Sequence, residues 1–152
     1  MLRWADQSDA AALGEVFHRA IREGTSPYSE AQRAAWSPRL RAAAFWTKRL
    51  AGLETLLEET DGRILGFMSM DAAGYVDLAF ILPEVRGTGM FRRLLTGLED
   101  RACGLGIARL WTFASLSAEP AFRSAGFRVI HREEVEMTGQ ILRRAKMEKP
   151  LA

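Results

Sequence analysis

The sequence of 152 residues has little or none of several features that mark special classes of protein. It contains one cysteine, Cys103, so no disulfide can form within the chain, which fits a reducing compartment. No apolar run approaches the roughly 20 residues that a membrane-spanning helix requires. Residues 1–6 lack the apolar core of a signal peptide. These absences argue against a disulfide-stapled module and a transmembrane protein, and they predict a cytoplasmic location.

Asparagine is absent and lysine is scarce, whereas arginine supplies 18 of the 21 basic residues. Because acidic residues number 19, the formal net charge is only +2. The arginines are mostly scattered among acids, which fits the codon bias of a GC-rich genome. A nucleic-acid-binding surface usually shows clustered basic residues, so nucleic acid is an unlikely partner. The exception is the stretch 86–93, where three arginines gather.

The length suits a single domain, residues 1–152, with a sizeable core. Apolar spacing and turn residues predict a first strand at 2–4 and a helix that Ser8 or Asp9 caps and that ends near Arg22. Helical stretches follow after Ser29 and around 45–50, then strands at 55–59, 63–70 and 75–82, a helix at 90–103, a strand at 107–114, a helix at 117–125 and a hairpin at 127–137 and 139–147. The predicted order, βααβββαβαββ, is that of an α/β fold with a mixed sheet.

The strongest local signal follows the apolar strand 75–82, where two glycines precede a helix. The first N–H groups of a helix have no intrahelical partner, and together with the helix dipole they attract anions. Glycines allow close backbone approach and positive φ angles. The pattern predicts a phosphate or pyrophosphate cradle, and a tight turn that merely needs glycine is the alternative. Arg92 replaces the third glycine of a dinucleotide fingerprint, and the Gly-Lys-Ser/Thr of a P-loop is missing.

The run Phe80-Ile81-Leu82-Pro83-Glu84-Val85-Arg86-Gly87-Thr88-Gly89-Met90 resembles motif A of the GNAT acetyltransferases. Arg86 and Gly89 fill the first two fixed positions of Arg/Gln-x-x-Gly-x-Gly/Ala, and Phe91 departs from the last. The segment ending in Gly126-Phe127 is similar to a later motif of the family, and the order of elements agrees along nearly the whole chain. The resemblance implies a mixed, mostly antiparallel central sheet flanked by helices.

The resemblance also implies acetyl-CoA as co-substrate, without a metal. It assigns the pyrophosphate to the main chain of Arg86, Gly87, Thr88, Gly89, Met90 and Phe91. It assigns the pantetheine arm to the strand edge at Phe80, Ile81 and Leu82. An N–H group there, expected at Ile81, would bind the thioester oxygen that gains charge in the tetrahedral intermediate.

The acceptor amine must lose a proton, and Asp77 is the candidate base. It lies four residues before Ile81, so strict alternation places both side chains on one face. The alternative is that Asp77 pairs with an arginine or bonds to the backbone. Glu54, Glu58 and Glu59 are weaker candidates.

The family often uses a tyrosine to protonate the leaving thiolate, and Phe122 occupies that position here. Phenylalanine cannot donate a proton, so we expect Phe122 to pack against pantetheine or the core. Ser115 or Ser117 would relay a proton through water, although Ser117 also suits a helix cap.

The acceptor pocket is expected in the first helical region, where Tyr28, Trp36 and Trp46 could line it. His18 and His131 lack partners at metal-ligand spacing. The leading hypothesis is an N-acetyltransferase that acts on a primary amine of a small molecule or peptide, and a homodimer is possible. The alternatives are an acyl-CoA sensor without catalysis and an enzyme acting on aminoacyl-tRNA.

Overall fold

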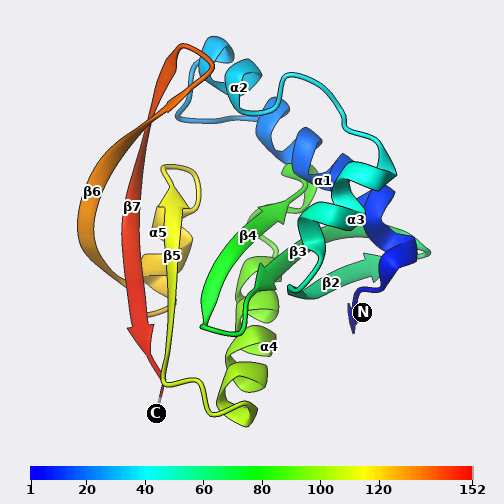
Figure 1. Ribbon diagram of the computed structural model, residues 1–152, viewed down its shortest axis with the longest axis vertical. Coiled ribbons are helices and arrows are strands. Elements are labelled where there is room, and N and C mark those ends of the chain that lie inside the picture. The colour runs from blue at the N-terminus through cyan, green and yellow to red at the C-terminus, as the bar shows by residue number, and fades with distance from the viewer. Residues whose placement is uncertain (152) are drawn as a thin grey trace.

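The computed structural model describes residues 1–151 and contains one seven-stranded sheet with helices against its faces (Figure 1). The strands are β1 (Leu2–Trp4), β2 (Glu54–Thr60), β3 (Arg63–Met70), β4 (Tyr75–Ile81), β5 (Arg109–Ser115), β6 (Arg128–Met137) and β7 (Gln140–Pro150). The helices are α1 (Ala10–Arg22), α2 (Glu30–Trp36), α3 (Ala43–Leu50), α4 (Met90–Gly104) and α5 (Glu119–Ser124), with 3₁₀ turns η1 (Gln7–Asp9) and η2 (Pro83–Val85). The predicted α/β fold with a mixed sheet is confirmed.

The strands lie in the order β1-β2-β3-β4-β5-β7-β6, and only β4 and β5 run parallel. Three helices separate β1 from β2, in agreement with the three helical stretches that the sequence predicted, although the predicted order βααβββαβαββ included only two of them. The break between α2 and α3 falls at residues 37–42, because the ring of Pro38 cannot supply the N–H that a continuing helix needs. Arg22 also donates from Nη1 to the carbonyl of Ser37 at 3.0 Å, which holds the break in place. Within residues 1–151, no helix is long and apolar enough to cross a membrane.

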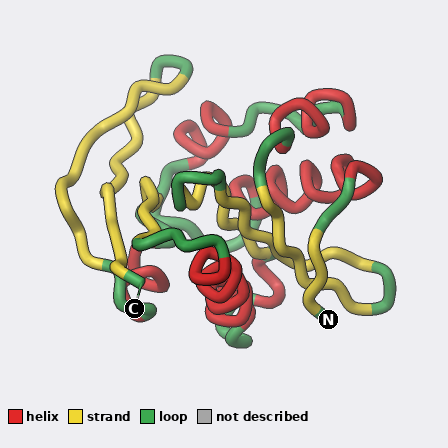
Figure 2. The backbone as a smooth tube through the Cα atoms, turned by 60° about the horizontal axis from the view of Figure 1, so that its bottom comes forward, coloured by secondary structure: helices red, strands yellow, loops and turns green. Residues whose placement is uncertain are grey.

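Two apolar clusters hold the helices on the sheet, one on each face. On one face, α4 contributes Leu94, Leu95 and Leu98, all without exposed surface, against β-strand residues such as Met68. On the other face, α1 and α3 pack over the sheet, and the cluster contains Leu13, Trp46 and Phe67. Figure 2 shows α4 on the side of the sheet opposite to the N-terminal helices. The sheet is therefore the middle layer of a three-layer molecule.

The sheet opens between its two halves. β4 and β5 pair only at Tyr75 with Trp111 and at Val76 with Thr112. Beyond these pairs the two strands diverge, and the β6–β7 hairpin stays with β5 (Figure 1). The later part of β4 is therefore left with one main-chain edge that has no strand partner.

A β-bulge at Asp77 changes which side chains of β4 share a face. The residues on either side of Asp77 pair with the consecutive residues Ser69 and Met70 of β3, so Asp77 is the extra residue. Asp77 contacts Arg49 of α3, whereas Ile81 packs against the cluster on the α4 side. The prediction that Asp77 and Ile81 share a face is wrong, because strict alternation assumes a strand without a bulge.

Candidate active site

A cavity of about 520 Å³ lies beside the free edge of β4, and we refer to it as the loop-side cavity. Its walls include residues 79–81 of β4, most residues from 85 to 92, Ser115 at the end of β5, and Ser117, Ala118, Ala121 and Ser124 beyond it. Cavities of this size commonly take small molecules or cofactors. The motif singled out in the sequence and the opening of the sheet therefore border one space.

The start of α4 forms one end of the loop-side cavity. Gly87 and Gly89 have φ angles of 76° and 84°, in the left-handed region that favours glycine. The first helical hydrogen bond runs from the N–H of Arg93 to Gly89, and within residues 1–151 the N–H groups of residues 87–92 have no protein acceptor. Thr88 Oγ1 donates to the carbonyl of Val85 at 2.6 Å and fixes the turn. Exposed, aligned N–H donors at a helix N-terminus form an anion site.

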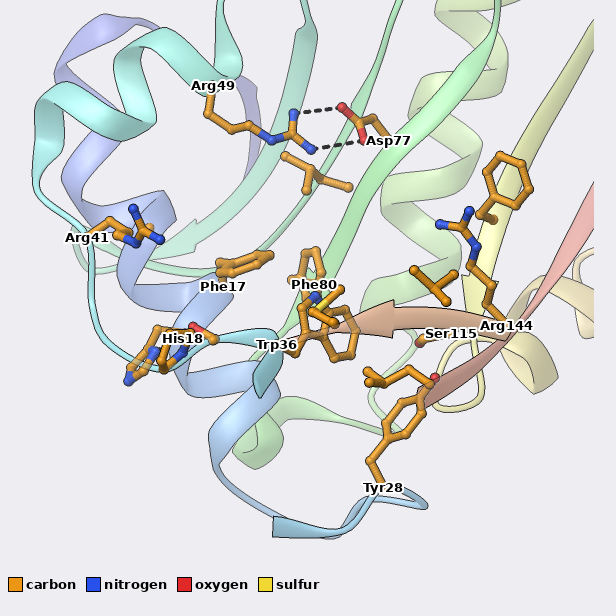
Figure 3. Close-up of a pocket in the computed structure, with 18 of the residues that line it drawn as sticks. Phe17, His18, Tyr28, Trp36, Arg41, Arg49, Asp77, Phe80, Ser115 and Arg144 are labelled. Atoms are coloured by element: carbon orange, nitrogen blue, oxygen red, sulfur yellow. Dashed lines mark hydrogen bonds and ion pairs between the residues drawn. The ribbon is translucent and has the colours of Figure 1, made fainter. Parts of the chain in front are cut away.

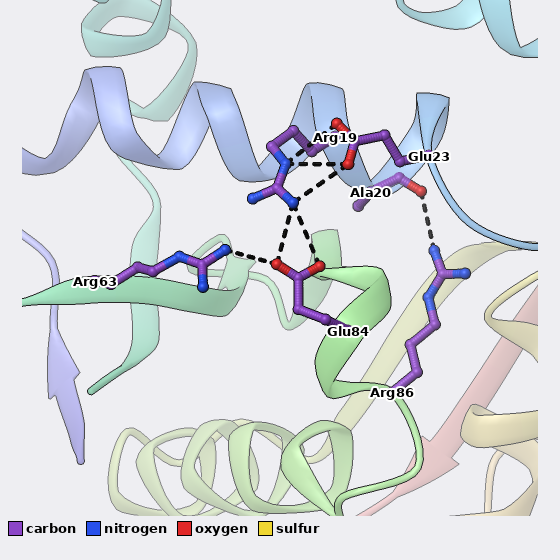
Figure 4. Close-up of polar contacts among 6 residues, drawn as sticks. All are labelled: Arg19, Ala20, Glu23, Arg63, Glu84 and Arg86. Atoms are coloured by element: carbon purple, nitrogen blue, oxygen red, sulfur yellow. Dashed lines mark hydrogen bonds and ion pairs between the residues drawn. The ribbon is translucent and has the colours of Figure 1, made fainter. Parts of the chain in front are cut away.

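The three arginines of this region have separate roles. Arg86 donates to the carbonyls of Ala20 at 3.0 Å and Thr25 at 2.9 Å, and its burial lowers its pKa (Figure 4). Arg93 pairs with Glu58 through two contacts of 2.8 Å. Arg92 lines the loop-side cavity and donates to the carbonyl of Ser124 at 3.1 Å. The cluster seen in the sequence is thus partly neutralised or used for structure, and Arg92 remains the best placed for an anion.

The free edge of β4 presents a different set of main-chain groups from the predicted one. The N–H of Leu82 donates to Leu65 of β3 at 2.9 Å, so alternation turns the main chain of Phe80 toward β3 as well. The main-chain groups of Ala79 and Ile81 therefore face the opening. Ala79 was missed, and Leu82 is a core residue with 1% exposed surface, because the sequence does not reveal which residues pair with β3.

A second cavity, of about 300 Å³, lies next to the first, and its walls are rich in aromatic side chains and arginine (Figure 3). We refer to it as the aromatic cavity. Four residues line both cavities and so form their common wall: Tyr28, Trp36, Phe80 and Ser115. Trp46 lines the aromatic cavity from the core, where its indole lies against Gly14 and is 2% exposed. The structure thus brings together all three aromatic residues predicted for an acceptor pocket.

Tyr28 holds the common wall in place through its hydroxyl group. The oxygen accepts a hydrogen bond from the N–H of Leu116 at 2.8 Å and donates to the carbonyl of Arg143 at 2.8 Å. Its ring makes an edge contact with Trp36 at 5.8 Å between centroids. Burial raises the pKa of Tyr28, so its hydroxyl keeps its proton at neutral pH.

Asp77 lies in the aromatic cavity and forms an ion pair with Arg49. Two contacts join the carboxylate and the guanidinium, at 2.7 Å and 3.0 Å. In Figure 3 this pair occupies one end of the cavity and Tyr28 the other, with Phe80 between them. The alternative prediction, an arginine partner for Asp77, is confirmed, although no pattern in the sequence indicated that the partner is Arg49.

The rim of the aromatic cavity is rich in arginine and has one carboxylate, Asp77, among its described residues. The arginines are Arg39, Arg41, Arg49, Arg143 and Arg144. Arg144 pairs with Glu133 at 2.7 Å. Arg39 and Arg41 lie on the segment between α2 and α3, and within residues 1–151 neither has a carboxylate within 4 Å. Their position beside Pro38, in an irregular and aromatic-rich region, was the signal in the sequence that could have identified them.

Phe122 occupies the core, one of its two predicted places, and Ser117 lies on the cavity wall without the predicted role as a helix cap. Phe122 is 1% exposed and packs edge-to-face with Phe91 and Phe127, each at 4.9 Å, so it belongs to the core and is absent from the cavity wall. Phe91 itself lines the loop-side cavity, whereas the side chain of Met90 is buried. Ser117 lies on the cavity wall without capping α5. The N–H of Ala118 binds Ser115 Oγ at 3.2 Å, so Ser115 serves that turn.

The split sheet therefore has a helix start with unpaired N–H groups beside one cavity and a second, aromatic cavity next to it. The family model described as "Acetyltransferase (GNAT) domain" matches residues 25–151. The chain therefore belongs to the GNAT acetyltransferases and is an enzyme of the N-acetyltransferase family, as its motifs indicated.

Solved structures of bacterial proteins share the fold over almost the whole chain. A GCN5-related N-acetyltransferase from Rhodopseudomonas palustris is 30% identical, with a TM-score of 0.91 over 99% of this chain and 95% of that chain. The acetyltransferase yncA from Salmonella typhimurium, solved with acetyl-CoA, is 22% identical, with a TM-score of 0.74 over 100% of this chain and 94% of that chain. A phosphinothricin acetyltransferase from Sinorhizobium meliloti, also solved with acetyl-CoA, is 22% identical, with a TM-score of 0.77 over 100% of this chain and 88% of that chain.

Among curated proteins, the L-amino acid N-acyltransferase MnaT of Escherichia coli (strain K12) is 27% identical over 113 residues. The match covers 68% of this chain and 64% of MnaT, which is less than two thirds of the relative's length.

Proposed function

We propose that the protein transfers an acetyl group from acetyl-CoA to the primary amine of a small molecule. The observation that carries this proposal is the pair of cavities that meet at Tyr28, Trp36, Phe80 and Ser115. One cavity has the donors that a pyrophosphate requires, and the other is a separate space for an acceptor. Direct attack of the amine on the thioester needs both substrates to meet at such a wall.

The loop-side cavity has the features that acetyl-CoA needs. The N–H groups of residues 87–92 would bind the pyrophosphate, and Arg92 would add positive charge beside it. The free main-chain groups of Ala79 and Ile81 would pair with the pantetheine arm. An N–H group of this edge, at Ile81 or two residues farther from the loop at Ala79, would stabilise the negative oxygen that forms during attack. Loss of one such donor typically lowers the rate by about 10²–10³-fold.

Asp77 would receive the proton of the attacking amine through water. An alkylamine with a pKa of about 10.4 is mostly protonated near pH 7, so it needs help to reach its neutral form. Asp77 and Ile81 are roughly 13 Å apart along a strand, so a chain of water molecules has to join them if Ile81 holds the oxygen. The carboxylate keeps lone pairs available beside its two contacts with Arg49. Ser117, on the wall of the loop-side cavity, is one candidate to relay a proton to the leaving sulfur.

The aromatic cavity favours an amine that also carries an acid group. Arg39 and Arg41 leave positive charge at its mouth, which would repel polyamines and other polycations and attract a carboxylate. A volume of about 300 Å³ suits a small molecule better than a folded protein. The name of MnaT, an L-amino acid N-acyltransferase, supports the same class of acceptor.

Thiol release from acetyl-CoA tests this proposal with acceptors of different charge. We expect phenylalanine to react at least about 10-fold faster, in kcat/KM, than phenylalaninamide or spermidine. The double variant Arg39→Gln, Arg41→Gln should reduce this preference, whereas Lys48→Gln, on the exposed side of α3 and outside the aromatic cavity, should leave it unchanged. Equal rates for phenylalanine and spermidine would reject the acid-bearing acceptor while leaving acetyl transfer intact.

A second candidate function is an acyl-CoA sensor without catalysis, which the core position of Phe122 favours. The sensor would bind acetyl-CoA tightly and release no thiol with any acceptor of the panel. Robust turnover by the natural sequence would exclude it.

A further inference from the structure

The side chain of Tyr28 is buried, carries a hydroxyl group and lies on the wall between the two cavities. Under the proposed function, the bond that breaks joins the acetyl carbon to sulfur, and this bond lies where donor and acceptor meet. Phe122 cannot supply a proton there, because it has no hydroxyl group and is buried in the core. Ser117 is exposed and, within residues 1–151, its hydroxyl group has no hydrogen-bond partner to orient it.

Burial keeps the proton on Tyr28 in the resting protein, and two hydrogen bonds fix the position of its hydroxyl group. Its oxygen already accepts the N–H of Leu116, and this bond would stabilise the phenolate left after proton transfer. The proton itself points to the carbonyl of Arg143, and rotation of the hydroxyl group would turn it toward a sulfur bound in the loop-side cavity, whose wall Tyr28 lines. The ring is held by Trp36, so the hydroxyl group is presented without movement of the backbone.

We propose that Tyr28 is the general acid of the acetyl transfer, a role that rests on the proposed function. The amine nitrogen forms a bond to the acetyl carbon, and the electron pair of the carbon–sulfur bond moves to sulfur. The hydroxyl proton of Tyr28 passes to that sulfur and yields the free thiol of coenzyme A. The nitrogen loses one proton through water to Asp77. Asp77 then releases this proton to solvent, and solvent returns a proton to the phenolate, so the protein ends in its starting state.

The test compares two donors, acetyl-CoA and acetyl-seleno-CoA, in which selenium replaces the thioester sulfur. A selenol is more acidic than a thiol, so its anion leaves without protonation. We expect Tyr28→Phe to lower kcat with acetyl-CoA by about 10²-fold, the lower range of general acid catalysis, and to lower kcat with the selenoester by less than about 5-fold. The ratio of the two rates does not depend on how much of the variant is folded.

A control variant separates a catalytic role of Tyr28 from its structural role, which is to hold the β6–β7 hairpin through the carbonyl of Arg143. Gln32 Nε2 donates to the carbonyl of Ile141 at 2.8 Å, so Gln32 ties α2 to β7 much as Tyr28 ties the preceding loop to that strand, and it lies outside both cavities. Gln32→Ala should leave the ratio of the two rates unchanged. An equal loss with both donors in Tyr28→Phe would overturn the proposal and reduce Tyr28 to a structural role. A changed ratio in Ser117→Ala, with an unchanged ratio in Tyr28→Phe, would assign the proton to Ser117.

A binding measurement tests the contact without turnover. The chain has two tyrosines, so labelling with 3-fluorotyrosine gives two ¹⁹F resonances, which Tyr28→Phe assigns. We expect coenzyme A to shift the Tyr28 resonance more than desulfo-coenzyme A, which lacks the sulfur. Equal shifts by the two ligands would contradict a contact between Tyr28 and sulfur. This result stands even if no acceptor reacts, whereas absence of turnover by the natural sequence would refute the proposed function instead.

Discussion

Gly89 is the residue on which the anion site depends most directly. Its φ of 84° is unfavourable for other residues, and a Cβ at this position would lie 3.2 Å from Arg93 Nη1. We expect Gly89→Glu to place a negative charge beside the unpaired N–H groups and to lower acetyl-CoA affinity by at least about 10²-fold. Isothermal titration calorimetry measures this loss, and circular dichroism should show a retained fold.

Gly52 provides the matched control for this prediction. It has a similar φ of 80°, and nothing lies within 4 Å of a Cβ built there. Gly52→Glu should therefore carry a similar backbone strain, of about 1–3 kcal/mol, without loss of acetyl-CoA affinity. An unchanged affinity in Gly89→Glu would show that the loop is only a turn.

At the scale of single residues, the sequence predicts local features and misses distant partners. The positive φ angles of Gly87 and Gly89 follow from two glycines before a helix, and they were predictable. The ion pair of Asp77 with Arg49 joins residues 28 positions apart and depends on how α3 packs on the sheet. The same limit applies to Tyr28, whose partner Leu116 lies 88 positions away.

At the scale of elements, a polar network joins η2 to the C-terminal end of α1 (Figure 4). Glu84 accepts hydrogen bonds from Arg19 at 3.1 Å and from Arg63 at 2.6 Å. Arg86 adds its bonds to the carbonyls of Ala20 and Thr25. The ion pairs are exposed and individually weak. The two hydrogen bonds of Arg86 tie the loop 86–89 to the end of α1, so we assign to Arg86 the positioning of this loop.

Salt dependence distinguishes positioning from phosphate binding. We expect Arg86→Met to weaken acetyl-CoA binding by about 10-fold. Without its hydrogen bonds to α1, the loop 86–89 is less ordered in the free protein, and ordering it on binding costs free energy. The dependence of the dissociation constant on ionic strength should stay as in the natural protein. Arg92→Gln, which removes a charge on the cavity wall, should reduce that dependence. A reduced salt dependence in Arg86→Met would instead make Arg86 a phosphate ligand.

The elements themselves were largely predictable because apolar periodicity and turn residues mark them. The strand 75–81 and the helix that starts at Met90 follow such patterns. The bulge at Asp77 was not predictable, since it is defined by pairing with Ser69 and Met70 rather than by β4 alone. The bulge residue Asp77 lines the aromatic cavity, and the edge that β4 leaves open beyond its pairing with β5 lines the loop-side cavity. The sequence alone therefore did not show which residues of β4 face each cavity.

At the scale of the whole molecule, ion pairs link distant parts of the sheet and its helices, and they make stability depend on pH. Glu119 binds Arg132 of β6 at 2.6 Å and Arg123 at 2.9 Å. The hydrogen bond from Arg132 is the main cause that lowers the pKa of Glu119 from 4.5 to about 2. Arginine partners also lower the pKa values of Asp9 and Glu58, so the effect is spread over the fold.

A carboxyl group with a lower pKa in the folded state stabilises the fold at pH values above its unfolded pKa. This contribution is lost as the pH falls through the folded pKa, so we expect the urea midpoint to be steady above about pH 5 and to decrease toward pH 2. Glu119→Gln keeps the shape of the side chain and removes its titration. We expect Glu119→Gln to lower the free energy of unfolding at pH 7 by about 1 kcal/mol, a value that allows for solvent screening of the ion pairs. The variant should also show a smaller decrease of the urea midpoint between pH 4.5 and 2. Glu15→Gln, on α1 and in none of the ion pairs described, should leave the profile unchanged. An identical acid profile in Glu119→Gln and the natural protein would show that the link between α5 and β6 contributes nothing to the folded state.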